Sequence, residues 1–82
     1  MKDRDYIRQE AETLYNYILD DEEKFDNMKH VYARIFNSIE GIVECQVGGI
    51  DNLEISVKDI KDIIKDVVES SPRKTEIIKK LN

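Results

Sequence analysis

The sequence contains a single cysteine, Cys45, and a single histidine, His30. One cysteine cannot form a disulfide within the chain, so a small fold held by several disulfides is excluded. One cysteine and one histidine also cannot complete a structural zinc site without additional carboxylate ligands. We therefore predict that the protein holds no metal ion and no cofactor.

Long apolar runs are absent as well. No stretch approaches the roughly 20 consecutive apolar residues that cross a bilayer as a helix. The first residues, Met1-Lys2-Asp3-Arg4-Asp5, contain acids where a secretory signal would have its apolar core. We therefore expect an intracellular, cytoplasmic protein that has no membrane partner.

Glycine and proline are scarce, with three and one among 82 residues, whereas 40% of the chain is hydrophobic. Regularly spaced apolar residues with few helix breakers predict one folded, mainly helical domain over residues 1–82. A chain this short buries only about 60% of its unfolded surface when it folds alone. Because little net stability then remains, we expect a homodimer or a tight complex with a partner protein.

Two apolar stripes with helical spacing run through the first half of the chain and predict helices over residues 3–19 and 25–39. The second helix is expected to end near Gly41, and the acids at residues 20–23 are expected to cap its start. This interpretation gives two antiparallel helices joined by a tight turn. One long coiled-coil helix over residues 3–40 is the alternative, because the apolar positions keep a single heptad register. The stripes consist of Ile7, Ala11, Leu14, Tyr15 and Ile18, and of Phe25, Met28, Tyr32, Ile35, Phe36 and Ile39.

Residues 42–57 are ambiguous. Apolar and polar residues alternate on both sides of Gly48 and Gly49, which predicts a short β-hairpin. In the other interpretation, Asp51 and Glu54 form a capping box that starts a helix at Asn52. Both alternatives stay open, with a loop at the two glycines in either case.

The last part of the chain again shows helical spacing. A stripe of isoleucine and valine over residues 57–69 predicts a third helix, for which Ser56 and Asp59 offer an alternative capping box. Ser71 as a cap and Pro72 at the first helical position predict a short fourth helix. The expected fold is therefore mainly α, a helical hairpin plus one long and one short helix, with an α+β arrangement as the alternative if residues 42–57 form strands.

The sequence carries no pattern typical of an enzyme. It has no glycine-rich phosphate loop and no serine or cysteine beside a base, so we predict no catalytic residues. His30 lies on the side of its predicted helix opposite to the apolar stripe and is expected to point to water. Cys45, in an alternating apolar segment, is expected to be a buried small apolar side chain rather than a nucleophile.

The tripeptide Asp51-Asn52-Leu53 is similar to the Asp-Ser-Leu of acyl carrier proteins, which are also small, acidic and helical. In that family the serine accepts phosphopantetheine. Asn52 stands in its place here and has no hydroxyl group for the attachment. A carrier-like role is therefore only the last of the alternatives.

Charge is distributed unevenly along the chain. Residues 1–23 contain eight acidic and three basic residues, a net charge of −5, and residues 72–82 contain four basic and one acidic residue, a net charge of +3. The basic C-terminal segment suggests a nucleic-acid-binding regulator as an alternative function, although a net charge of −5 for the whole chain is not typical of that class. Lys58, Lys61 and Lys65 share one edge of the third helix and are interpreted as a solvated face.

Tyr6 and Tyr17 are separated by about three helical turns and share a face of the first helix away from its apolar stripe. Aromatic side chains beside acids are typical of an interface with a basic protein surface. We predict that Tyr6, Glu10, Tyr17, Asp20 and Asp21 bind a partner protein. The protein is expected to be a regulator or inhibitor of that partner, of the kind that phages and mobile elements encode.

Overall fold

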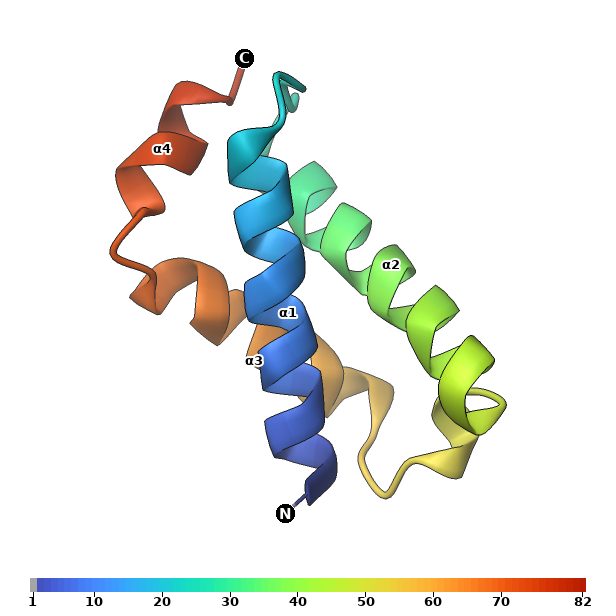
Figure 1. Cartoon of the computed structure of the whole chain (residues 1–82). Coiled ribbons are helices and arrows are strands. Elements are labelled where there is room, and N and C mark those ends of the chain that lie inside the picture. Colours follow the sequence, from blue (N-terminus) through green and yellow to red (C-terminus); the bar gives the residue numbers. More distant parts are fainter. Residues whose placement is uncertain (1) are drawn as a thin grey trace.

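The computed structural model describes residues 2–82, without the side chain of residue 2. Over this range the chain forms four α-helices and one short 3-10 helix, α1 (Lys2–Asp20), α2 (Met28–Val47), η1 (Ile50–Asn52), α3 (Val57–Ser70) and α4 (Lys74–Lys79) (Figure 1). The only β-type pairing among these residues is an isolated parallel bridge between Phe25 and Leu81. The prediction of a mainly α fold is confirmed.

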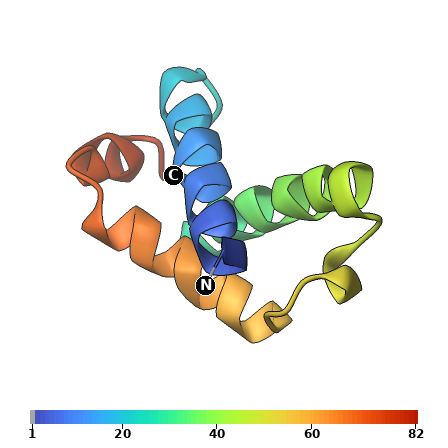
Figure 2. The same ribbon diagram turned by 60° about the horizontal axis from the view of Figure 1, so that its bottom comes forward.

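The helix α1 lies at the centre of the arrangement. It packs against both α2 and α3, and the two views show α2 on one side of it and α4 on the other, with α3 crossing its N-terminal half (Figures 1 and 2). The C-terminal end of the chain returns to the loop between α1 and α2, where Phe25 N donates to Lys80 O at 2.8 Å and Asn82 N donates to Phe25 O at 2.7 Å.

The core is formed almost entirely by aliphatic side chains, with one buried tyrosine and one buried phenylalanine. The predicted stripes of α1, α2 and α3 all supply core residues, and α4 adds one. The buried residues of α3 are without exception isoleucine or valine. The buried hydrophobic residues are Ile7, Ala11, Tyr15, Ile18, Leu19, Phe25, Val31, Ile35, Ile39, Val43, Ile55, Ile60, Ile63, Ile64, Val67, Val68 and Ile77.

The chain breaks between α1 and α2, so the helical pair is confirmed and the single coiled-coil helix is wrong. The connection covers residues 21–27 and is longer than the predicted tight turn. Asn27 caps α2, and its side-chain Oδ1 accepts the His30 N–H at 3.2 Å. The expectation that residues 20–23 cap α2 is therefore wrong, because the chain first has to bury Phe25 and pair its backbone with residues 80 and 82.

The helix α2 continues through Gly41 to Val47, so the predicted end near Gly41 is wrong. Burial explains the difference, because Val43 extends the stripe of Ile35 and Ile39 by one more turn and is fully buried. The helix stops at Gly48, whose φ of 90° lies in the left-handed region and whose N–H donates to Glu44 O at 3.1 Å.

The β-hairpin suggested for residues 42–57 is not formed, and the helix start at Asn52 is also wrong. Asn52 ends the 3-10 helix η1, and its side-chain Nδ2 donates to Val47 O at 2.6 Å, so it closes the end of α2 instead. The capping serine of α3 is Ser56, whose Oγ accepts the Asp59 N–H at 3.1 Å. The alternative cap predicted from Ser56 and Asp59 is thus the one the chain uses.

The short fourth helix is confirmed, but it begins at Lys74 rather than at Pro72. Ser71 acts one turn earlier, where its Oγ accepts the Arg73 N–H at 3.1 Å. Two adjacent isoleucines then differ sharply in environment, because Ile77 is buried and Ile78 points outward.

Replacing Gly41 with Ala is expected to raise the free energy of unfolding by about 0.5–1 kcal/mol. Gly41 is exposed in the middle of α2, and a Cβ atom added there would have no neighbour within 4 Å. Alanine therefore removes the entropic cost of a helical glycine without a clash. Urea unfolding followed by circular dichroism measures the change. Gly48→Ala is the control and should destabilise, since its φ is positive and the added Cβ would lie 3.0 Å from Asn52 Nδ2.

Candidate functional site

The two tyrosines of the predicted interface lie in different environments. Tyr17 has 72% of its surface exposed. Tyr6 is half-buried against the core, and its hydroxyl donates to Gln46 Oε1 at 2.6 Å. Burial, and secondarily the nearby charge of Glu10, raises the pKa of Tyr6. Tyr6 therefore joins α1 to the end of α2, whereas Tyr17 is exposed.

The basic residues of α1 point toward α3. Arg8 Nη2 lies 2.7 Å from Asp66 Oδ2, and Arg4 Nη2 lies 3.3 Å from Asp59 Oδ1. The hydrogen bond and charge of Arg8 hold the pKa of Asp66 below its usual value. Because α1 uses both arginines against α3, the other charged side chains of α1 that the structure describes are all carboxylates.

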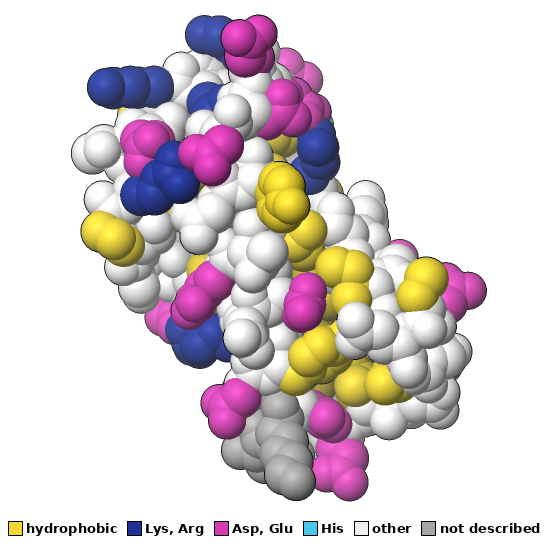
Figure 3. Space-filling view, in the orientation of Figure 1, with side chains coloured by type: hydrophobic (Ala, Val, Ile, Leu, Met, Phe, Trp, Pro, Cys, Tyr) yellow, Lys and Arg dark blue, Asp and Glu magenta, His cyan; other side chains and the backbone are white. Residues whose placement is uncertain are grey.

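The three acids of the predicted interface also differ from one another. Asp20 is paired with Arg73 at 2.7 Å. Glu10 is partly exposed and Asp21 exposed, and neither has an ion-pair partner among the side chains that the structure describes. In the view of Figure 3, hydrophobic side chains form a band along the α1 and α2 side of the molecule with acidic side chains beside it.

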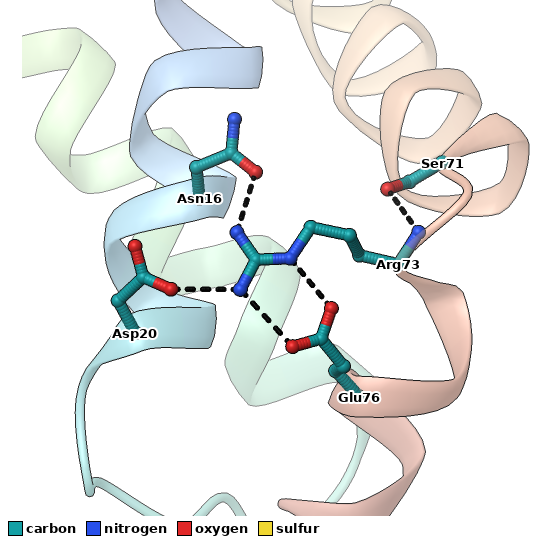
Figure 4. Close-up of polar contacts among 5 residues, drawn as sticks. All are labelled: Asn16, Asp20, Ser71, Arg73 and Glu76. Carbon is teal, nitrogen blue, oxygen red and sulfur yellow. Dashed lines mark hydrogen bonds and ion pairs between the residues drawn. The ribbon is translucent and has the colours of Figure 1, made fainter.

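Arg73 is the centre of a polar cluster that attaches the start of α4 to the end of α1 (Figure 4). Its Nε donates to Glu76 Oε2 at 2.5 Å, and its two terminal nitrogens donate to Asp20 Oδ1 at 2.7 Å and to Asn16 Oδ1 at 3.1 Å. The hydrogen bonds to Glu76 and Asp20 raise the pKa of Arg73, and the hydrogen bond from Arg73 lowers the pKa of Glu76. The planar guanidinium suits this arrangement, since it can serve several acceptors in one plane.

Acid is expected to weaken the attachments of α1 to α3 and α4. The pKa values of Asp66 and Glu76 are lowered in the folded protein, mainly by hydrogen bonds from Arg8 and Arg73. Such groups stabilise the fold fully above their unfolded pKa values, ordinarily 3.8 and 4.5. This stability is lost as the pH falls through the lower folded values. Melting temperatures measured from about pH 6 down to about pH 2 should show the loss.

Both carboxylates are solvent-accessible, so the acid-induced loss should be modest and should shrink when salt is added. Glu76→Gln is the matched variant, because it keeps the shape of the side chain and removes the titration. It should show a flatter decline below about pH 4.5. An unchanged decline in Glu76→Gln would mean that the Arg73 cluster does not contribute.

The single histidine and the single cysteine lie near opposite ends of α2. His30 is exposed, as predicted, and its Nδ1 lies 3.4 Å from Asp26 Oδ2. Cys45 is also exposed, so the prediction that it is buried is wrong. In a helix Cys45 is turned well away from the core residue Val43, which the assumed alternation of a strand would have placed on the same side. Among residues 2–82, no three histidine, cysteine or acidic side chains gather as metal ligands would.

Sequence reasoning missed one surface. Lys61 and Lys65 were interpreted as part of a solvated face, but both lie beside a groove between α2 and α3, with the Lys61 ammonium 5.4 Å from the centre of the Phe36 ring. Both helices can be predicted from the sequence, but the way they pack against each other cannot. A signal was nevertheless present, since Tyr32 and Phe36 give α2 an apolar edge that extends beyond its fully buried stripe.

None of the helices in the described part of the chain combines the length and the apolar composition that a bilayer crossing needs. The chain matches no protein-family model, no curated protein sequence and no solved structure.

Proposed function

We propose that the protein is a binding module that recognises a basic surface of another protein and regulates or inhibits that partner. The observation that carries the proposal is the position of Tyr17, which is 72% exposed on a helix whose arginines point elsewhere. An exposed tyrosine supplies a large apolar contact area at low entropic cost, and surrounding carboxylates favour a cationic partner.

The proposed binding surface comprises Tyr17, Glu10 and Asp21. It also includes Asp20, which is paired with Arg73 through Oδ1 but keeps an exposed side chain. Tyr6 packs against the core and its hydroxyl is engaged by Gln46, so it is not counted among the anchors of the proposed interface. The guanidinium of Arg73 is already held by Asn16, Asp20 and Glu76, so nothing specific favours the nucleic-acid alternative. A homodimer is also proposed, since Tyr17 and the outward-facing Ile78 are large exposed apolar side chains.

Replacing Tyr17 with Ala is expected to weaken partner binding by about 2 kcal/mol, or roughly thirtyfold, without loss of helix. Tyr17 makes no contribution to the buried core, so circular dichroism should be unchanged. The partner is first identified by affinity capture with the wild-type chain. The dissociation constants of wild type and variant are then measured by calorimetry with the purified partner.

Tyr6→Phe is the control variant, because it loses only the hydrogen bond to Gln46 and should bind normally. Asp21→Lys should weaken binding in a salt-dependent manner, as expected for attraction to a basic partner. Sedimentation velocity on the same variants reports the homodimer. Equal binding by wild type and Tyr17→Ala would place the interface elsewhere and contradict the proposal.

A further inference from the structure

A groove of about 430 Å³ separates α2 from α3, away from the Tyr17 surface. Its floor contains Tyr32, Ala33 and Phe36 of α2 and Ile64 of α3. Tyr32 and Phe36 lie one helical turn apart and pack against the core with part of their surfaces exposed. The floor is therefore an apolar, largely preformed surface that can accept an apolar side chain.

The groove is lined by Lys29, Lys61 and Lys65, and none of these lysines has an ion-pair partner among the described side chains. The one acid that lines the groove, Asp62, faces Lys58 at 3.6 Å. Three lysines and one aspartate give the lining a formal charge of +2, whereas the whole chain carries −5. The sign of the charge is thus reversed at this groove, whose lining includes the two aromatic side chains Tyr32 and Phe36.

We propose that this groove binds an acidic segment of a partner protein, in which an aliphatic or aromatic side chain is flanked by carboxylates. The apolar side chain would lie on Tyr32 and along Phe36, next to the Lys61 ammonium that lies 5.4 Å from the centre of the Phe36 ring, and the carboxylates would pair with the ammonium groups of the lining. Lysines whose charges are not balanced within the protein are suited to this, because binding then separates no existing ion pair. A nucleic acid is disfavoured, since a long polyanion would extend beyond the groove and be repelled by the net charge of −5 of the chain.

The test uses a fluorescein-labelled peptide of sequence Glu-Glu-Leu-Glu-Glu-Phe-Glu-Glu and the full chain, with binding followed by fluorescence anisotropy. Replacing every Glu of the peptide with Gln, or its Leu and Phe with Ala, should each weaken binding by at least about tenfold. Amide NMR shifts should change at Ala33, Asn37 and Lys61 on addition of the acidic peptide. They should not change around Tyr17.

The variant Lys29→Glu/Lys65→Glu should bind the acidic peptide at least about tenfold more weakly. Lys74→Glu/Lys79→Glu is the matched control, because it changes the net charge equally at exposed positions of α4 and should bind within about twofold of wild type. Circular dichroism verifies that both variants fold.

Four results of the binding measurements would overturn the proposal. These are no detectable binding of the acidic peptide, equal binding of the glutamine peptide, equal losses in the two charge variants, and tighter binding of a short oligothymidylate than of the acidic peptide. Self-association that disappears in Lys29→Glu/Lys65→Glu without any peptide would also overturn it, since a second copy would then fill the groove. Loss of the Tyr17 interaction would leave this result unaffected, because the two surfaces are tested with separate variants.

Discussion

Replacing Tyr15 with Ala is expected to lower the free energy of unfolding by about 3–5 kcal/mol, the range for a large aromatic side chain removed from a core. Tyr15 is only 2% exposed and belongs to the central core cluster. The neighbouring side chains cannot fill the space of the removed ring, so the alanine variant is expected to contain a cavity. Against a total stability of about 5–15 kcal/mol for a typical domain, this loss is large enough to unfold the protein at moderate temperature.

The conservative variant Tyr15→Phe should have the opposite sign and raise the free energy of unfolding by about 1 kcal/mol. The Tyr15 hydroxyl is buried and has no hydrogen-bond partner among the described residues. Burial raises the pKa of this group, and the Ser71 hydroxyl nearby weakens the effect without completing a hydrogen bond. Phenylalanine keeps the packing and removes the unsatisfied group.

Urea unfolding of both Tyr15 variants, with circular dichroism as the signal, measures the two changes. If Tyr15→Phe destabilises the protein by more than about 1 kcal/mol, the hydroxyl makes a hydrogen bond in solution. The double variant Tyr15→Phe/Ser71→Ala then shows whether Ser71 is the partner.

The second large effect is expected at Ile77. Ile77→Ala should cost about 2–5 kcal/mol, because the side chain is 1% exposed and provides the only core residue of α4. Ile78→Ala should cost less than about 0.5 kcal/mol, since Ile78 is 56% exposed. Both variants replace an isoleucine of α4 with alanine, and they differ only in which of two adjacent positions is changed.

Thermal unfolding of the two isoleucine variants provides the measurement. Helix propensity is improved equally in both, because alanine is the better helix former in either position. The difference between them therefore reports the docking of α4 onto the rest of the protein. Equal melting temperatures would show that α4 does not pack as described.

The helices with clear stripes were predictable from the sequence almost to the residue. The expected ranges 3–19 and 57–69 differ from α1 and α3 by one residue at most at each end. These helices have one continuous apolar face each, and burial of that face determines both their period and their length.

The segment after Gly41 was not predictable in the same way, because Val43, Cys45 and Val47 fit a strand period while Val43 alone also fits the helical period of Ile39. A helix satisfies its own backbone hydrogen bonds, whereas a strand here would have needed a pairing partner. A glycine costs an exposed helix only about 1 kcal/mol, which the burial of Val43 can offset.

The candidate sites depended still more on packing. The helical spacing of α1 places Tyr6 and Tyr17 on one face. Only the unexpected length of α2 brings Gln46 within hydrogen-bond distance of Tyr6, whereas Tyr17 stays exposed. Likewise, Arg73 donates hydrogen bonds to Asn16 and Asp20 of α1 only because α4 docks beside the end of α1. No local pattern in the sequence indicates where α4 docks.

The shortness of α4 has a consequence for how proteases should cut the protein. This six-residue helix is held by Ile77, by the Arg73 cluster and by the bridge between Phe25 and Leu81. So few attachments are expected to open far more often than the whole molecule unfolds. Each opening exposes a segment with four trypsin sites, at Arg73, Lys74, Lys79 and Lys80. Trypsin should therefore trim this segment first, while α1, α2 and α3 remain as a transiently resistant fragment.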